Sequence, residues 1–159
     1  EDILAHGVDQ ARRVYTGRYG SSELDAALLK VPAIGLEQAS APRVRATVDA
    51  IASDLDAGDG LLYRYPPGTD DLGPTEGAFL ACSFWMVEAL CGLGRIDEGV
   101  ELFESLCRRS NDVGLFAEQI DPTTGAHLGN FPQALTHSSL IEAALAIRSA
   151  TQASAEDPR

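Results

Sequence analysis

The segment from residue 114 to residue 135, GLFAEQIDPTTGAHLGNFPQAL, contains an acid that a plain connecting loop has little need for. Glu118 follows the apolar run LFA at residues 115–117 and precedes the sequence Asp-Pro-Thr-Thr-Gly at residues 121–125. That sequence is a strong turn signal, and it should fix the backbone after the acid. A carboxylate held in this way is suited to general acid–base chemistry. Glu118 could instead cap a turn or pair with an arginine, and the pattern leaves both interpretations open.

A second candidate is Arg64, which lies among aromatic residues in the stretch GLLYRYP at residues 60–66. Rings such as that of Tyr65 can cover the apolar face of a sugar, and a guanidinium can donate hydrogen bonds to its hydroxyls. The pattern indicates a sugar site, although a short hairpin strand with an exposed arginine fits it as well. Glu76 and Asp25 stand at the starts of expected helices, where the helix dipole favours an acid, and this structural role fits Asp25 best.

Six helical segments of two kinds are predicted to position these residues. Three carry an apolar stripe opposite charged residues, and we expect them to be outer helices: residues 2–17, 43–56 and 95–109. Three others are apolar or small on most sides and should be buried all round: residues 24–31, 78–93 and 134–147. The alternation of outer and inner helices predicts an all-α, two-layer array, either a solenoid or part of a closed ring.

The long connections all lead from an outer helix to an inner helix. They cover residues 57–76 and 110–133, whereas the inner helix at 78–93 passes to its successor through only a few residues. Because the inner helices then run in one direction, both long loops should lie at the same end of the molecule. Loops of this length in a compact domain are usually functional, and these contain Arg64, Glu76 and Glu118.

Composition narrows the function further. The formal net charge of −12 disfavours binding to nucleic acid, and the chain has no apolar run long enough to span a membrane. No signal peptide is visible, so we expect a cytoplasmic protein. Cys82, Cys91 and Cys107 fall at apolar helical positions and are predicted to be buried free thiols. Metal-binding spacings are absent from the sequence, and we predict neither a metal nor a cofactor.

Together these stretches resemble glycoside hydrolase family 15, the glucoamylase and bacterial trehalase-like enzymes. The resemblance is carried by YGSSELDAALL, GLLYRYP, EGAFLACSFWMVEAL and NDVGLFAEQIDPTTGAHLGNFPQALTHSSLI. It implies the C-terminal half of the catalytic domain over residues 1–150, followed by a polar tail at 151–159, and a partial (α/α)6 toroid of about three outer–inner pairs.

The resemblance also implies roles for individual residues. Family members hydrolyse terminal α-glucosidic bonds with inversion, and it assigns the general base to Glu118. It implies that Arg64 binds the sugar, with Glu76 near the same pocket. Tyr65 and Gln119, the neighbours of Arg64 and Glu118 in sequence, are predicted to bind substrate with them.

One departure from the family pattern concerns the general acid. The family places it in a Trp-Glu motif, whereas Trp85 in this chain is followed by Met86. We therefore expect this chain to carry the base, to lack the acid and to be inactive alone. The substrate of the intact enzyme could be maltodextrin or trehalose. The alternative is a non-catalytic helical-repeat interaction module, and a half ring would also tend to self-associate.

Overall fold

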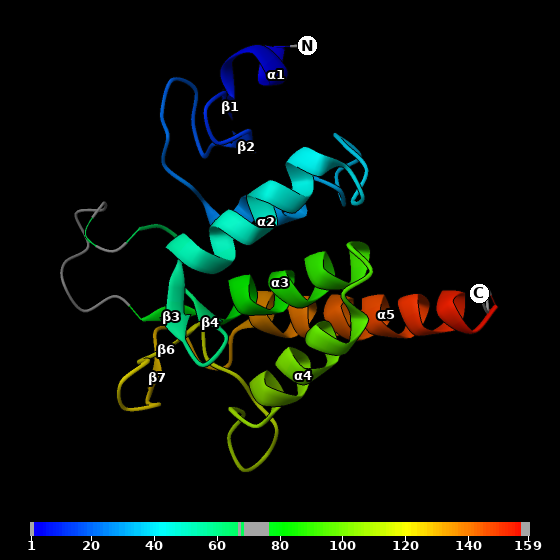
Figure 1. Cartoon of the computed structure of the whole chain (residues 1–159). Coiled ribbons are helices and arrows are strands. Elements are labelled where there is room, and N and C mark those ends of the chain that lie inside the picture. The colour runs from blue at the N-terminus through cyan, green and yellow to red at the C-terminus, as the bar shows by residue number, and fades with distance from the viewer. Residues whose placement is uncertain (1, 67, 69–76, 157–159) are drawn as a thin grey trace.

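The computed structural model describes residues 2–66, 68 and 77–156, and its bulk is a set of packed helices (Figure 1). The long helices are α2 (Pro42–Asp54), α3 (Leu80–Gly92), α4 (Ile96–Cys107) and α5 (Ala134–Glu156). Helix α3 packs against α2, α4 and α5, and α4 also contacts α5. The prediction of an all-α protein with α3 as an inner helix is therefore confirmed.

Burial of α3 follows directly from its composition. Every residue of this helix except Glu88 and Gly92 is buried. Neighbouring side chains point into different parts of the core: Trp85 packs with the residues of α2, and Phe84 packs with those of α4 and α5. The Phe84 ring meets the Phe116 ring edge-on at a centroid distance of 5.6 Å. An aromatic pair with this geometry stabilises the fold by about 0.5–1.5 kcal/mol beyond its buried area.

The outer helices α2 and α4 bury one face each. In α2 the buried residues recur at Val44, Val48 and Ile51, and Pro42 occupies its first turn, where no N–H donor is needed. Helix α3 ends at Gly92, and Gly94 then adopts φ +76, with its N–H donating to the Cys91 carbonyl. This left-handed turn connects α3 to α4 within a few residues, as the short GLGR sequence predicts.

The N-terminal helix prediction is wrong after residue 6. Helix α1 covers only Asp2–His6, and a hairpin of β1 (Val8–Asp9) and β2 (Val14–Tyr15) follows it. The Asp9 carboxylate accepts hydrogen bonds from the N–H groups of Ala11 and Arg12, and Arg13 has φ +59. This aspartate-centred turn competes with the helix and reverses the chain. The buried Val14 and Tyr15 therefore pack on α2 from a strand.

Two other predicted helices have different bounds. The segment predicted at 24–31 forms a 3-10 helix, η1 (Ala26–Lys30), which begins at the Asp25 cap. Helix α5, predicted at 134–147, continues to Glu156, and residues 151–156 are exposed on its last turns. None of the helices among the described residues is both long and apolar enough to span a membrane.

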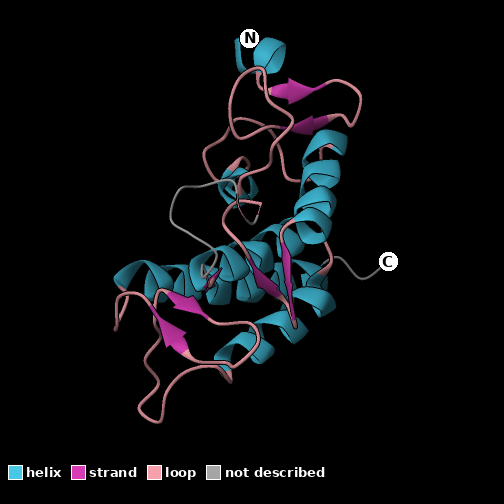
Figure 2. Cartoon of the chain, turned by 90° about the vertical axis from the view of Figure 1, so that its left-hand side faces the viewer, coloured by secondary structure: helices cyan, strands magenta, loops and turns pink. Residues whose placement is uncertain are grey.

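The two long loops contain short strands and meet at one end of the helices (Figures 1 and 2). The first holds β3 (Asp56–Gly58) and β4 (Leu61–Leu62), which pair as a hairpin. After it, β5 (Ala78–Phe79) pairs with β6 (Gln119–Ile120) of the second loop, and β6 pairs with β7 (His127–Leu128). All of these pairings are antiparallel. For the described residues, the predicted convergence of the two loops is confirmed.

Candidate active site

Glu118 lies where the first turns of two helices meet. Its backbone carbonyl accepts a hydrogen bond from the N–H of Leu80, the first residue of α3. The adjacent Ala117 carbonyl accepts one from the Thr136 hydroxyl in the first turn of α5, at 3.0 Å. Ala117 and Thr136 are both fully buried. The backbone of Glu118 is therefore held between two packed helix N-termini, whose dipoles place partial positive charge on this segment.

The Glu118 carboxylate has two different oxygens. Oε2 accepts hydrogen bonds from the backbone N–H of Asn130 at 3.0 Å and from its side-chain Nδ2 at 2.8 Å. The Glu118 N–H in turn donates to the Asn130 carbonyl at 3.0 Å. Oε1 accepts no hydrogen bond from any described residue, and the side chain is half-buried. One oxygen is therefore fixed, and the other can receive a proton from water.

Gly129 permits this arrangement. Its φ is +71, and a Cβ atom at this position would lie 2.7 Å from Oε2 and 3.0 Å from Cβ of Glu118. A side chain there would collide with the carboxylate. Sequence reasoning missed Gly129 and Asn130, although the Gly-Asn pair directly after β7 was a visible turn signal.

The predicted turn after Glu118 is present and well bonded. Asp121 Oδ1 accepts from the N–H of Thr123 at 2.8 Å, and Oδ2 accepts from the Thr124 hydroxyl at 2.7 Å. The Thr124 hydrogen bond, followed by that from the Thr123 N–H, lowers the pKa of Asp121 below its ordinary value. Asp121 is thus a turn residue that joins β6 to β7, which fixes the backbone as the sequence indicated.

Gln119 connects the two loops. Its side-chain Oε1 accepts a hydrogen bond from the Gly77 N–H at 3.1 Å, and its backbone pairs with Phe79 of β5. Its Nε2 donates to no described residue, so the amide N–H groups remain available to a ligand. Gly77 directly follows Glu76, which lies outside the described residues.

Arg64 lies two residues beyond β4 and is paired with Asp25. Its Nε donates to Asp25 Oδ1 at 2.6 Å, and its Nη2 donates to Oδ2 at 3.3 Å. The guanidinium carbon lies 5.2 Å from the centroid of the Tyr65 ring and 5.6 Å from that of Trp85. Burial is the largest single effect and would lower the pKa of Arg64, but the hydrogen bonds to Asp25 and the negative charge of Asp25, with smaller charge interactions from Cys82 and Tyr65, together outweigh burial, and the pKa is raised. Arg64 is thus neither an isolated nor a freely exposed arginine.

Arg64 and Glu118 flank the beginning of α3. The Glu118 carbonyl accepts a hydrogen bond from the N–H of Leu80, whereas the Arg64 guanidinium lies over the ring of Trp85. The positive charge of Arg64 also acts to lower the pKa of Cys82, against the effect of burial. Burial raises the pKa of Cys82 to about 12, so this thiol stays neutral at physiological pH. Cys82 and Cys91 are buried free thiols as predicted, whereas Cys107 is only half-buried.

The histidines of this region form hydrogen bonds with backbone carbonyl groups. His127 Nε2 lies 2.8 Å from the Arg109 carbonyl, and His137 Nδ1 lies 2.7 Å from the Gln133 carbonyl. The described residues contain no group of three or more histidine, cysteine, aspartate or glutamate side chains arranged to hold a metal ion.

The packed helices and the two converging loops define a protein of the helical-toroid class. The chain belongs to glycosyl hydrolases family 15, whose family model matches residues 1–145. It is 50% identical over 144 residues to a trehalase of Mycolicibacterium smegmatis, covering 89% of this chain and 21% of the relative. It is 36% identical over 144 residues to a trehalase of Thermoplasma volcanium, covering 91% of this chain and 23% of the relative. The chain thus spans about a fifth of the length of these relatives.

Solved structures agree on the fold. A wild-type glycosidase superposes with a TM-score of 0.77 at 21% identity, over 92% of this chain and 41% of that chain. A glycosidase solved in complex with glucose superposes with a TM-score of 0.76 at 21% identity, again over 92% of this chain and 41% of that chain. The predicted partial (α/α)6 toroid is therefore confirmed.

Proposed function

We propose that this chain supplies the general base, Glu118, to an intact enzyme that hydrolyses the α-glucosidic bond of trehalose with inversion. The observation that carries the proposal is the difference in hydrogen bonding between the two oxygens of the Glu118 carboxylate. Oε2 is held by two N–H groups of Asn130, and Oε1 has no partner among the described residues. A base of this kind needs a fixed direction and one free lone pair, and Glu118 has both.

In the proposed mechanism, Oε1 of Glu118 accepts a proton from a water molecule as that water attacks the anomeric carbon. The two N–H groups of Asn130 compensate the negative charge of the carboxylate before the reaction. The glycosidic oxygen leaves with a proton from a general acid on the opposite face, about 6.5–9.5 Å from the base. Because this chain has no Trp-Glu motif, that acid comes from another part of the intact enzyme.

The remaining predicted site residues have groups that are suited to contact the sugar. Arg64 has N–H groups that Asp25 does not use, and Tyr65 presents a partly exposed ring beside it. Gln119 keeps its amide N–H groups free of described partners. Glu76 stays a proposed contact, since it lies outside the described residues. We assign the site residues of the domain at 1–150 to one glucose unit on this basis.

Trehalose is preferred over maltodextrin because the relatives of the chain, at up to 50% identity, are named trehalases. The test is hydrolysis by the intact enzyme, with the products followed by NMR of the anomeric protons. Inversion at one anomeric carbon of trehalose should release one β-glucose and one α-glucose per molecule. Cleavage of maltodextrin without cleavage of trehalose would overturn the substrate proposal.

The base assignment has its own test. Glu118→Gln keeps the shape and removes the basic oxygen, so kcat should fall by about 10²–10⁴-fold while KM changes little. Glu101→Gln removes an exposed carboxylate of α4 and serves as the matched control, with kcat unchanged. Normal turnover in a folded Glu118→Gln enzyme would show that the base is another residue.

A further inference from the structure

We infer that Asp25 is a positioning residue for the sugar site, acting through Arg64; this inference rests on the proposed function. The two residues are 39 positions apart: Asp25 caps η1, and Arg64 lies beyond β4. Their two hydrogen bonds run side by side, from Nε to Oδ1 and from Nη2 to Oδ2. This parallel arrangement fixes the direction of the planar guanidinium more tightly than a single contact does.

The pairing leaves part of the guanidinium free. An arginine side chain has five N–H donors in a rigid plane, and Asp25 takes two of them on one edge. The remaining three donate to no described residue, and the side chain keeps 26% of its surface exposed. The edge opposite Asp25 is therefore the edge that can reach the hydroxyls of a bound sugar.

Asp25 is itself held firmly. Its Oδ1 accepts a hydrogen bond from the Ala27 N–H at 2.7 Å, which caps η1. The adjacent Ala26 N–H donates to the Arg64 carbonyl at 3.0 Å, and Ala26 is fully buried. Backbone and side chain of Arg64 are thus both tied to the start of η1. A displacement of Asp25 would be transmitted directly to the guanidinium.

The aromatic neighbours complete the placement. Tyr65 and Trp85 lie 5.2 Å and 5.6 Å from the guanidinium carbon, within the range of cation–π attraction. Rings at these distances hold the guanidinium by attraction to its charge, but they specify no hydrogen-bonding direction. The carboxylate of Asp25 provides that direction.

The experiment compares Asp25→Asn and Arg64→Ala, singly and together, in the intact enzyme with trehalose as substrate. Asparagine caps helices as well as aspartate does, so Asp25→Asn keeps the bond to Ala27. It replaces one acceptor with an N–H donor facing Arg64, which should misdirect the guanidinium. We expect kcat/KM to fall about tenfold or more, largely through KM. The double variant should be no worse than Arg64→Ala, because Asp25 acts only through that residue.

Asp25→Ser is a second variant that tests the same link, since serine also caps a helix but is too short to reach Arg64. It should reproduce the kinetic defect of Asp25→Asn.

Unchanged kinetics in both variants, or a double variant whose loss equals the product of the single losses, would overturn the inference. If Arg64→Ala binds trehalose normally while Glu118→Gln is inactive, the inference falls and the proposed function stands. If Glu118→Gln is fully active, the base assignment in the proposed function has failed instead.

Discussion

Asn130 gives two N–H donors, one from its backbone and one from its side chain, to the same oxygen of Glu118, at 3.0 Å and 2.8 Å. The Asn130 carbonyl also accepts the N–H of Glu118. These residues thus form a closed set of contacts across the ends of β6 and β7, and no residue in the described part of the chain donates to the second carboxylate oxygen. The direction of that second oxygen depends on this set of contacts.

Replacement of Asn130 by alanine should reduce turnover without unfolding the protein. Asn130→Ala removes the Nδ2 donor and keeps the backbone donor, so the carboxylate loses one of its two restraints. We expect kcat of the intact enzyme to fall about tenfold, since a misplaced catalytic group is costly even when present.

Asn111 is the matched control for this change. Its Oδ1 accepts from the N–H groups of Val113 and Leu115 in its own loop, away from the carboxylate of Glu118. Asn111→Ala should therefore lower Tm and leave kcat nearly intact. The opposite result, with kcat lost in Asn111→Ala and kept in Asn130→Ala, would contradict the role given to Asn130. Steady-state kinetics and thermal melts decide between the two.

Alanine variants at Gly129 and Gly125 distinguish the effect of backbone strain from the effect of a steric collision with Glu118. Both have positive φ, +71 and +72, so alanine is strained at either position. A Cβ at Gly129 would also lie 2.7 Å from Oε2 of Glu118, whereas a Cβ at Gly125 would meet nothing within 4 Å. Gly125→Ala should cost about 1 kcal/mol or somewhat more in unfolding free energy and leave activity unchanged.

Gly129→Ala should show the same strain and, in addition, displace the carboxylate, so kcat should drop well below that of Gly125→Ala. Denaturant unfolding and trehalose hydrolysis measure the two effects independently. Equal activity in the two variants would mean that the carboxylate can shift at no catalytic cost.

The sequence predicted the parts of the site that depend on local signals. Helix α3 was predictable because it is apolar on every side, and the turn that begins at Asp121 was predictable from its Asp-Pro-x-x-Gly pattern. The turn centred on Asp9 was not foreseen, because Val8 and Tyr15 fit a helical stripe as well as they fit two short strands. Hydrophobic periodicity cannot distinguish the two when a side chain, here that of Asp9, provides the competing hydrogen bonds.

Pairings between distant segments were beyond sequence reasoning. Asp25 was interpreted as a helix-start carboxylate, and it does cap η1, but its bond to Arg64 joins residues 39 positions apart. The contact between Glu118 and Asn130 spans 12 residues and requires the β6–β7 hairpin to have the observed register. Neither spacing has a helical or strand period, so only the folded arrangement brings these groups together.

Cys82 should make the stability of the chain fall at alkaline pH. Burial raises its pKa to about 12, whereas an unfolded thiol ionises near pH 8.5. Between these values the unfolded state binds fewer protons than the folded state, so the free energy of unfolding decreases as pH rises. The contribution is fully present below about pH 8.5 and is lost progressively toward pH 12, by at most about 1.4 kcal/mol per pH unit.

Cys82→Ala should therefore be less stable at pH 7, because it leaves a small cavity, but its stability should depend less steeply on pH above 9. Cys107→Ala, at a half-buried position, provides the comparison. Urea unfolding at several pH values measures both slopes. A Cys82→Ala slope identical to that of the unmodified chain would show that Cys82 does not contribute to the alkaline loss.

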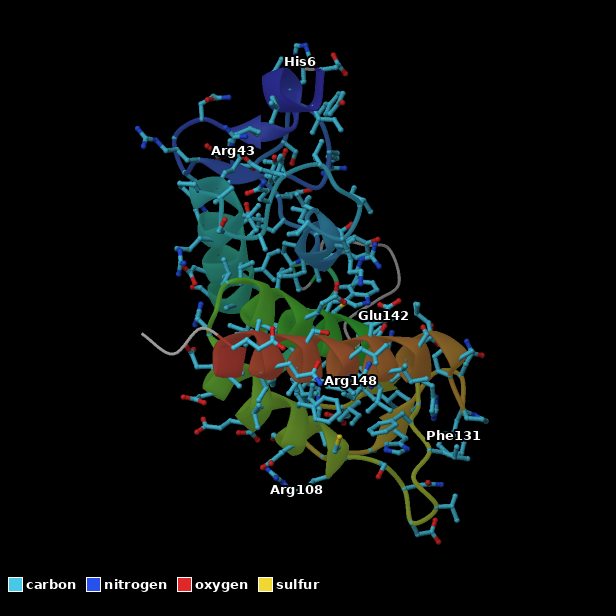
Figure 3. All side chains as sticks on the ribbon, turned by 90° about the vertical axis from the view of Figure 1, so that its right-hand side faces the viewer. His6, Arg43, Arg108, Phe131, Glu142 and Arg148 are labelled. Atoms are coloured by element: carbon cyan, nitrogen blue, oxygen red, sulfur yellow. The ribbon has the colours of Figure 1, made fainter. Side chains whose placement is uncertain are left out.

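The outer face of α5 should make the isolated chain self-associate. Ile141 and Leu145 lie one turn apart on this helix and are 58% and 44% exposed. Between them Glu142 points to the edge of α5 near η1, where it pairs with Lys30 at 2.9 Å (Figure 3). Clustered exposed apolar side chains of this kind mark surfaces that bind a partner.

Ile141→Ser combined with Leu145→Ser should shift the chain toward monomer, because it removes the clustered apolar surface while keeping the ion pair of Glu142. Val113→Ser is the matched control. Val113 is 69% exposed but lies on the loop that follows α4 and not on α5, so its replacement should leave association unchanged. Sedimentation equilibrium of the isolated chain over a range of concentrations measures the effect. A chain that stays monomeric at every concentration, with a sharp thermal transition, would contradict the prediction and mean that the α5 face is stable in water.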